Sequence, residues 1–287
     1  MKNLVYNFDW DDNVMFMKTK IWYFHKNPEK AKAKGLPLEI PISTETFRHT
    51  RKKVGVKTSY GYYKVSRSKI SETTKDDSKA VKINYKDYEI VDPGRDSSLT
   101  CGRNSFREFR DGDEVNYFLE DLKYSLKNKL YGPCWDKFVK CLSNKTTAAK
   151  MTIITARGHS PKAMYEGLKY LKAQGYIKYL PLMRHVFPVS YQGLDKKYVG
   201  SADNPSEAKK NVIINSLDIY QEEAADCPKN QPREFGFSDD DHNTIETIKE
   251  SLIPLVEEGR WPNLKIALYF TGNKEEEEIV LQEAVSA

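Results

Sequence analysis

The sequence lacks any hydrophobic run long enough to span a membrane. Its 287 residues are 39% hydrophobic and 30% charged, and the mean hydropathy is −0.69. We therefore expect a globular protein with a polar surface and no membrane partner. An acidic cluster at residues 9–12 interrupts the one apolar stretch near the N-terminus, which argues against a signal peptide. A cytoplasmic location is the expectation.

Soft metal ligands in a recognisable spacing are also lacking. The four cysteines form no CxxC pair and no zinc-binding pattern, so we expect reduced, mostly structural thiols. Cys134 and Cys141 lie on an expected helix, seven positions apart, and both are predicted to face its buried side. The histidines His159, His185 and His242 show no ligand spacing either, and we interpret all three as structural.

A net excess of charge of one sign is lacking outside a single segment. Residues 41–100 contain 13 Lys/Arg against 8 Asp/Glu, an excess of five that equals the net charge of +5 of the whole chain. Tyrosines lie among these basic residues, at Tyr60, Tyr62, Tyr63, Tyr85 and Tyr88. Such a surface can bind phosphate backbones and stack bases. The alternative is that the tyrosines form strands and the lysines protect exposed sheet edges.

The remaining pattern alternates strands and helices. Short apolar strands are predicted near residues 4–14, 151–158, 235–241 and 264–270, and amphipathic helices at 114–126, 135–142, 161–174, 206–220 and 244–257. This order predicts an α/β fold with a doubly wound, Rossmann-like parallel sheet. We expect residues 1–26 and 113–287 to form this core, and residues 27–112 to form an inserted, β-rich, basic cap domain after the first strand.

Four shorter segments carry weaker patterns. Residues 15–24 suit a hairpin or flap, 27–35 a surface turn or short helix, and 71–79 a polar turn. The acidic run at 275–278 predicts a solvated segment that leads into a helical turn or a frayed end.

The first strand ends in a cluster of acids. Asp9 and Asp11 would point the same way if the strand continued, whereas Asp12 would point to the other face. Two carboxylates this close repel each other unless a cation joins them. A hard divalent ion such as Mg²⁺ suits oxygen ligands.

Two other predicted strands also end in polar groups. Thr155 and Arg157 follow one strand, and Asp239 and Asp240 follow another. Parallel strands would bring these ends to the same edge of the sheet, where ligands of open α/β folds bind.

The three strand ends resemble motifs of the haloacid dehalogenase-like hydrolase superfamily, phosphatase type. The first motif stands as Phe8-Asp9-Trp10-Asp11, the second as Thr152-Ile153-Ile154-Thr155, and the fourth as Phe237-Ser238-Asp239-Asp240. The third, a lysine before the fourth, fits Lys209 or Lys210. The match covers residues 1–18 and 130–272, and the segment 41–112 matches no family pattern that we can name.

The resemblance implies a role for each residue. Asp9 would attack phosphorus to form an aspartyl-phosphate, and Asp11 would protonate the leaving oxygen and then activate water. Mg²⁺ would bind Asp9, the backbone carbonyl of Asp11 and Asp239, with Asp240 or Asn243 completing the shell. Thr155 and Ala156 would bind the phosphoryl group, while Lys209 or Lys210 offsets its charge. Arg157 is either an ion-pair partner or a phosphate contact.

These expectations define a Mg²⁺-dependent phosphomonoester hydrolase that acts on a small phosphorylated substrate. The alternatives are a phosphatase of nucleic-acid ends and a non-catalytic binding protein that uses the basic, tyrosine-rich insertion. In the family pattern Asn13 replaces a commoner Thr, and Ser238 a usual Gly. We expect the first change to matter little and the second to alter the local backbone slightly.

Overall fold

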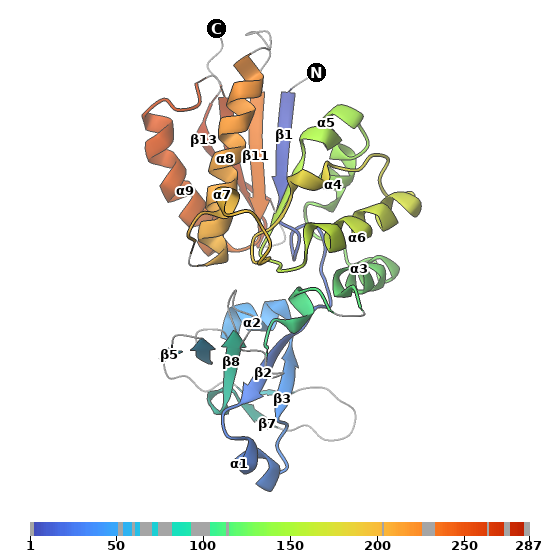
Figure 1. Cartoon of the computed structure of the whole chain (residues 1–287), viewed down its shortest axis with the longest axis vertical. Coiled ribbons are helices and arrows are strands. Elements are labelled where there is room, and N and C mark those ends of the chain that lie inside the picture. Colours follow the sequence, from blue (N-terminus) through green and yellow to red (C-terminus); the bar gives the residue numbers. More distant parts are fainter. Residues whose placement is uncertain are drawn as a thin grey trace. The chain divides into compact units, whose positions relative to one another are not determined.

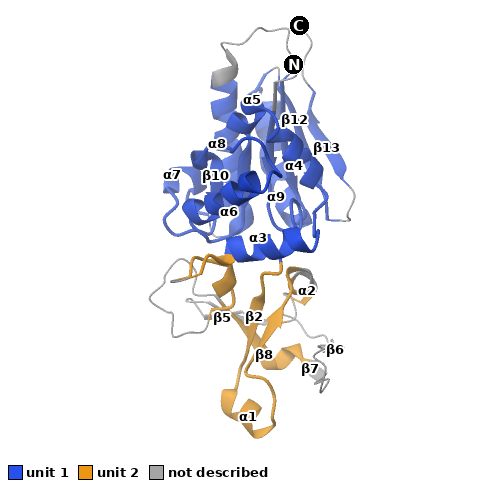
Figure 2. Ribbon diagram, turned by 90° about the vertical axis from the view of Figure 1, so that its right-hand side faces the viewer, with its two compact units in different colours: residues 1–17, 118–287 blue, residues 18–117 orange. Residues whose placement is uncertain are grey.

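The apolar run near the N-terminus forms β1 (Asn3–Phe8), the strand that the other parallel strands flank. The computed structural model describes residues 3–50, 54–58, 61–63, 71–73, 82–92, 104–112, 115–202, 204–225, 233–262, 264–272 and 276–283. Contacts divide the chain into two units, residues 1–17 with 118–287 and residues 18–117, coloured separately in Figure 2.

The larger unit contains a six-stranded sheet with the order β10-β9-β1-β11-β12-β13. Its other strands are β9 (Thr152–Thr155), β10 (Val186–Pro188), β11 (Arg233–Asp239), β12 (Leu264–Phe270) and β13 (Glu277–Gln282). All pairings are parallel except that of β13, which runs antiparallel to β12. Because β1 lies between β9 and β11, the carboxyl ends of these three strands are neighbours (Figure 1).

Helices cover both faces of this sheet, as the doubly wound prediction requires. One face packs against α3 (Tyr117–Lys127), α4 (Trp135–Cys141), α5 (Lys145–Lys150) and α6 (Pro161–Ala173). The other packs against α7 (Lys196–Val199), α8 (Pro205–Ala225) and α9 (His242–Glu257). Neighbouring strand residues alternate between the two cores. In β9, for example, Ile153 lies in the first core and Ile154 in the second.

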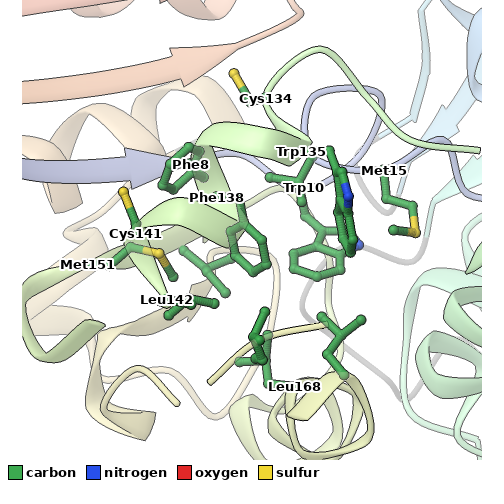
Figure 3. Close-up of a cluster of buried hydrophobic side chains, with 14 of the residues drawn as sticks. Phe8, Trp10, Met15, Cys134, Trp135, Phe138, Cys141, Leu142, Met151 and Leu168 are labelled. Carbon is green, nitrogen blue, oxygen red and sulfur yellow. The ribbon is translucent and has the colours of Figure 1, made fainter. Parts of the chain in front are cut away.

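Aromatic rings fill the first core directly beneath the end of β1. The ring of Phe138 meets both Phe8 and Trp10 edge-on, at centroid distances of 5.7 and 5.5 Å (Figure 3). Cys134 and Cys141 at the two ends of α4 are buried and free, as expected for structural thiols. This packing supports the backbone that leads into the acidic segment.

Local sequence signals set the starts of the helices behind the strand ends. Ser160 accepts a hydrogen bond from the N–H of Ala163 and caps α6, where Pro161 is the first residue. Ahead of α8, the side-chain oxygen of Asn204 accepts from the N–H of Glu207 at 3.0 Å. The cap of α9 is Asp241.

The smaller unit is mainly β. Its five-stranded sheet contains β3 (Glu39–Ile42), β2 (Ile21–His25), β8 (Tyr88–Asp92), β4 (Gly55–Thr58) and β5 (Gly61–Tyr63), in that order. A separate pair consists of β6 (Ser71–Thr73) and β7 (Lys82–Asn84). The helical turns are α1 (Pro28–Ala33), α2 (Thr44–Thr50), η1 (Tyr85–Asp87) and η3 (Arg107–Phe109). This unit is wider than the predicted 27–112 because β2 joins its sheet.

Two of the tyrosines considered for base stacking lie in the core of this unit. Tyr85 and Tyr88 are only 3% and 2% exposed, and the Tyr88 hydroxyl donates to the carbonyl of Pro37. Tyr88 is a strand residue of β8, Tyr85 begins η1, and both are core residues, so they do not offer their rings for stacking on bases. Tyr60 and the side chains of Tyr62 and Tyr63 lie outside the described residues.

Three local predictions were wrong. Instead of a hairpin over residues 15–24, a single strand β2 forms and pairs with β3. Residues 71–73 of the predicted polar turn form β6, because they pair with β7. β13 begins within the acidic run, at Glu277, and forms in place of a helical turn or a frayed end, since Ile279 and Leu281 pack against the second core.

The smaller expectations at 27–35 and along α3 are confirmed. Helix α1 is short, and Asn27 caps it by accepting from the N–H of Lys30. Phe118, Leu122 and Leu126 of α3 are buried. No helix among the residues that the structure describes is both long and apolar enough to cross a membrane.

Candidate functional site

Three strand ends bring the predicted site residues to one edge of the six-stranded sheet. Asp9 follows β1 directly, Thr155 is the last residue of β9, and Asp239 is the last residue of β11. The N–H of Asp9 donates to the carbonyl of Ser238 at 2.9 Å, so the pairing of β1 with β11 continues up to the acids. The topology therefore places side chains from three distant parts of the sequence side by side.

Three carboxylates form a buried cluster at this edge. Asp9, Asp239 and Asp240 each offer an oxygen within 4.8 Å of the others. Their exposed fractions are 4%, 0% and 8%. Asp239 is further oriented by the N–H of Asp241, which donates to its Oδ1 at 2.9 Å. Asn243, the alternative to Asp240, is exposed in the first turn of α9.

Lys209 reaches this cluster from α8. Its ammonium nitrogen lies 2.6 Å from Oδ2 of Asp239 and 3.1 Å from Oδ1 of Asp9. Lys210 instead forms an ion pair with Glu207 and is more exposed. Of the two lysines left open by the sequence, the structure brings Lys209 to the acids and Lys210 to the helix surface.

Burial dominates the electrostatics of the cluster. It raises the pKa of Asp9 to about 8, although the nearby Lys209 ammonium opposes the change. Burial also raises the pKa of Asp239, again against the pull of Lys209. For Lys209 burial acts to lower the pKa, but the carboxylates of Asp239 and Asp9 outweigh it and raise the pKa above its ordinary value. Lys209 therefore remains a cation, while the acids are held in a setting that disfavours their charge.

Asp11 points to a different partner. Its two carboxylate oxygens accept from Nε and Nη2 of Arg157 at 2.9 and 2.6 Å. The carboxylate of Asp11 is not part of the cluster of Asp9, Asp239 and Asp240. The predicted contact through the backbone carbonyl of Asp11 stays a prediction.

Asp12 lies in a turn rather than on a continuing strand. Its φ is +56°, in the left-handed region, and its N–H donates to the carbonyl of Met15. The strand ends at Phe8, so this turn, and not the pleat, orients the acids after Asp9. Such a turn suits aspartate, which tolerates left-handed backbone better than most residues.

The two predicted phosphate-binding residues on β9 differ in exposure. Thr155 is buried, and its Oγ1 accepts from the N–H of Arg157 at 3.4 Å. Ala156 is exposed. At this edge, Thr155 offers a hydroxyl, and Ala156 offers main-chain groups.

Asn13 is the residue whose importance the sequence analysis missed. Fully buried, it donates through Nδ2 to the carbonyls of Asp9 and Ser238, at 2.9 and 3.1 Å, and to Oγ of Ser238 at 2.9 Å. Its Oδ1 accepts from the hydroxyl of Thr271 at 2.9 Å. Asn13 thus joins the ends of β1 and β11 to the residue after β12. The available signal was a short amide side chain within the acidic segment, which by itself also suits an ordinary turn.

The donor set fits a hard divalent cation. Asp9, Asp239 and Asp240 bring three carboxylates together, and Lys209 contacts Asp9 and Asp239. Carboxylates this close repel one another when they are ionised, and a bound cation reduces that repulsion. Carboxylate oxygens are the ligands that Mg²⁺ prefers. The cluster of Asp9, Asp239 and Asp240 can therefore hold such an ion.

Comparisons of the chain with protein-family models, with curated proteins and with solved structures find no match. Any function assigned to this chain therefore rests on its own residues and their geometry.

Proposed function

We propose that this protein is a Mg²⁺-dependent phosphomonoester hydrolase that forms an aspartyl-phosphate on Asp9. The observation that carries the proposal is the buried cluster of Asp9, Asp239 and Asp240 with Lys209 at the carboxyl edge of a parallel sheet. Burying neighbouring carboxylates costs folding free energy, and such groups are typical of sites that bind a cation or carry out catalysis.

Each residue has a task in this chemistry. Asp9 attacks phosphorus, and the bond to the leaving oxygen breaks as that oxygen takes a proton from Asp11. Asp11 then takes a proton from water, whose oxygen displaces Asp9 from phosphorus. Thr155 donates a hydrogen bond to the phosphoryl group, and Lys209 offsets negative charge beside it. A bound Mg²⁺ would neutralise charge on the phosphoryl oxygens and on the cluster.

The basic segment supports an anionic substrate and keeps the two alternatives in view. The excess of five positive charges in residues 41–100 would attract phosphorylated compounds, including the ends of nucleic acids. Stacking on bases has less support, because Tyr85 and Tyr88 are buried. A small phosphorylated substrate is therefore our first choice, ahead of a nucleic-acid end or a purely binding role.

A hydrolysis assay on a panel of phosphate monoesters, with and without Mg²⁺, tests the proposal. We expect Mg²⁺-dependent release of phosphate by the native protein, a loss of about a thousandfold or more in Asp9→Asn because the nucleophile is gone, and a phosphoryl adduct on the Asp9 peptide by mass spectrometry. Asp136→Asn, which alters an exposed aspartate in the first turn of α4, is the control.

Two results would count against the proposal. Hydrolysis that persists in Asp9→Asn removes Asp9 as the nucleophile. If no phosphate ester is hydrolysed while RNA or DNA binds tightly, the binding-protein alternative takes its place.

A further inference from the structure

Arg157 is a completely buried cation at the edge of the site. Its side chain is 0% exposed, whereas that of its partner Asp11 is 17% exposed. The guanidinium meets the carboxylate in a two-pronged arrangement, with Nε on one oxygen and Nη2 on the other. This form of pairing fixes the direction of the carboxylate as well as its distance, because both partners are planar.

The main chain and the surroundings of Arg157 are also held in place. Its N–H donates to Oγ1 of Thr155, and its carbonyl accepts from the N–H of Ser190. The guanidinium carbon lies 5.3 Å from the ring centre of Phe118 on α3. The imidazole ring of His159 also packs against Phe118, with 6.0 Å between the centroids of the two rings. Burial, with a contribution from Arg157, lowers the pKa of His159 to about 2, so His159 is neutral and adds no second positive charge beside Arg157.

These contacts also bear on the two roles left open for Arg157. A direct contact with the substrate phosphate requires an accessible guanidinium. Arg157 has no exposed surface, and two of its donors are directed at Asp11. Asp11 is the more accessible member of the pair. The geometry therefore favours an action of Arg157 through Asp11 and not on the substrate itself.

We propose that Arg157 is a positioning residue that holds the Asp11 carboxylate in the one orientation from which it exchanges a proton with the leaving oxygen. This inference rests on the proposed function. The proton leaves Asp11 as the bond from phosphorus to the leaving oxygen breaks, and it arrives on that oxygen. Misorientation of Asp11 then harms only substrates whose leaving oxygen needs the proton. An alkyl phosphate needs it, whereas a p-nitrophenyl phosphate, with its stable leaving anion, does not.

The test compares kcat/KM for glycerol phosphate and for p-nitrophenyl phosphate in the presence of Mg²⁺. This constant covers the steps up to release of the leaving group and omits the later hydrolysis of the aspartyl-phosphate. Arg157→Lys keeps the charge but loses the two-pronged geometry. We expect a fall of about 10- to 100-fold for the alkyl ester, a part of what general acid catalysis supplies, and less than about threefold for the aryl ester.

A double-mutant comparison separates positioning from a direct contact with the substrate. In an Asp11→Asn background, Arg157→Lys should change kcat/KM for glycerol phosphate by less than about twofold, because its effect passes through Asp11. Arg260→Met is the matched control. It removes another two-pronged pair, with Asp218, at a more exposed place that precedes the amino end of β12, whereas the site lies at carboxyl ends of strands. The value of kcat/KM for both esters should stay unchanged.

Two other outcomes are distinguishable: one overturns only the positioning role of Arg157, and the other overturns the proposed function as well. Equal losses for both esters, or the same loss in the Asp11→Asn background, would show that Arg157 acts on the phosphoryl group or on folding, and would end the positioning proposal alone. A native protein that hydrolyses neither ester, nor any other phosphate monoester, overturns the proposed function and this inference together. Arg157→Gln, which keeps two N–H donors without the charge, repeats the test if thermal melting shows that Arg157→Lys is not folded.

Discussion

Lys209 and Lys210 are adjacent on α8, yet their ammonium groups have different partners. Successive residues of an α-helix point about 100° apart, so one of the two can face the strand ends while the other faces outward. Lys209 is buried between Asp239 and Asp9, and Lys210 pairs with Glu207 one turn earlier. Position on the helix, rather than residue type, separates the two lysines.

Replacing these two lysines should have very different effects on stability. Lys209→Met leaves the buried acids without their cation, and we expect the free energy of unfolding to fall by about 3–5 kcal/mol near neutral pH without Mg²⁺. Lys210→Met removes a partly exposed helix pair and should cost at most about 1 kcal/mol. Urea unfolding followed by circular dichroism measures both. Equal losses would mean that the contacts of Lys209 with Asp9 and Asp239 are not formed in solution.

The raised pKa of Asp9 predicts how stability depends on pH. The folded pKa of about 8 lies above the ordinary value of 3.8, so between these values the folded state binds the proton more tightly than the unfolded state. The stability that this proton provides is complete below about pH 4 and is lost as the pH rises through about 8.

Mg²⁺ should take the place of that proton. We expect the rise in melting temperature on adding Mg²⁺ to be larger at about pH 9 than at about pH 6, because at the lower pH the ion must displace the proton from Asp9. Asp9→Asn should remove most of this difference. Differential scanning calorimetry at the two pH values gives the result. If Mg²⁺ raised the melting temperature by the same amount at both pH values, the assignment of Asp9 to the cation site would be contradicted.

At the scale of the element, β13 shows that two apolar side chains can stabilise a strand that begins within a run of acidic residues. Glu278 accepts hydrogen bonds from Lys265 and from the hydroxyl of Tyr269, both on β12. Ile279 and Leu281 pack against the second core, while Val280 between them is 40% exposed. The period of two is that of a half-buried edge strand, and pairing with β12 gives the backbone its hydrogen bonds.

Alanine substitutions along β13 should follow this alternation. Ile279→Ala loses contacts with the core and should lower the free energy of unfolding by about 1–2 kcal/mol. Val280→Ala changes an exposed side chain, and we expect an effect within about 0.5 kcal/mol. Chemical unfolding of the two variants is the measurement. A larger cost for Val280→Ala would place the strand in the opposite register.

At the scale of the whole molecule, the candidate site belongs to one unit. The residues assigned a task in the proposed chemistry come from residues 1–17 or 118–287, on either side of the inserted unit. The two segments of the larger unit that flank the insertion contact each other. The hydroxyl of Ser125 on α3 donates to the carbonyl of Phe16 at 2.8 Å. The inserted unit has its own sheet and its own buried core.

Cation binding should therefore survive removal of the inserted unit. In a protein with Lys18–Tyr117 replaced by a Gly/Ser linker of about ten residues, we expect the dissociation constant for Mg²⁺ to stay within about threefold of the native value, because the acids and Lys209 remain. Isothermal titration calorimetry compares the two proteins, with Asp239→Asn in the full chain as the control that loses binding. Loss of Mg²⁺ binding by a shortened protein that still melts cooperatively would show that the inserted unit contributes to the site.

The sequence by itself determined the alternation of strands and helices, the β-rich insertion and three acid-bearing or hydroxyl-bearing strand ends. These features follow from periodicities of two and 3.6 residues and from the rule that parallel strands end at a common edge. The tertiary structure alone decided that Lys209 and not Lys210 meets the acids, that Arg157 holds Asp11, that Asn13 joins three strand ends, and that β13 is a strand. Each of these depends on partners far away in the chain, from Lys209 with Asp9 to Asn13 with Thr271. Local patterns do not contain such contacts, because their energies arise only when the packed helices and sheet bring distant side chains together.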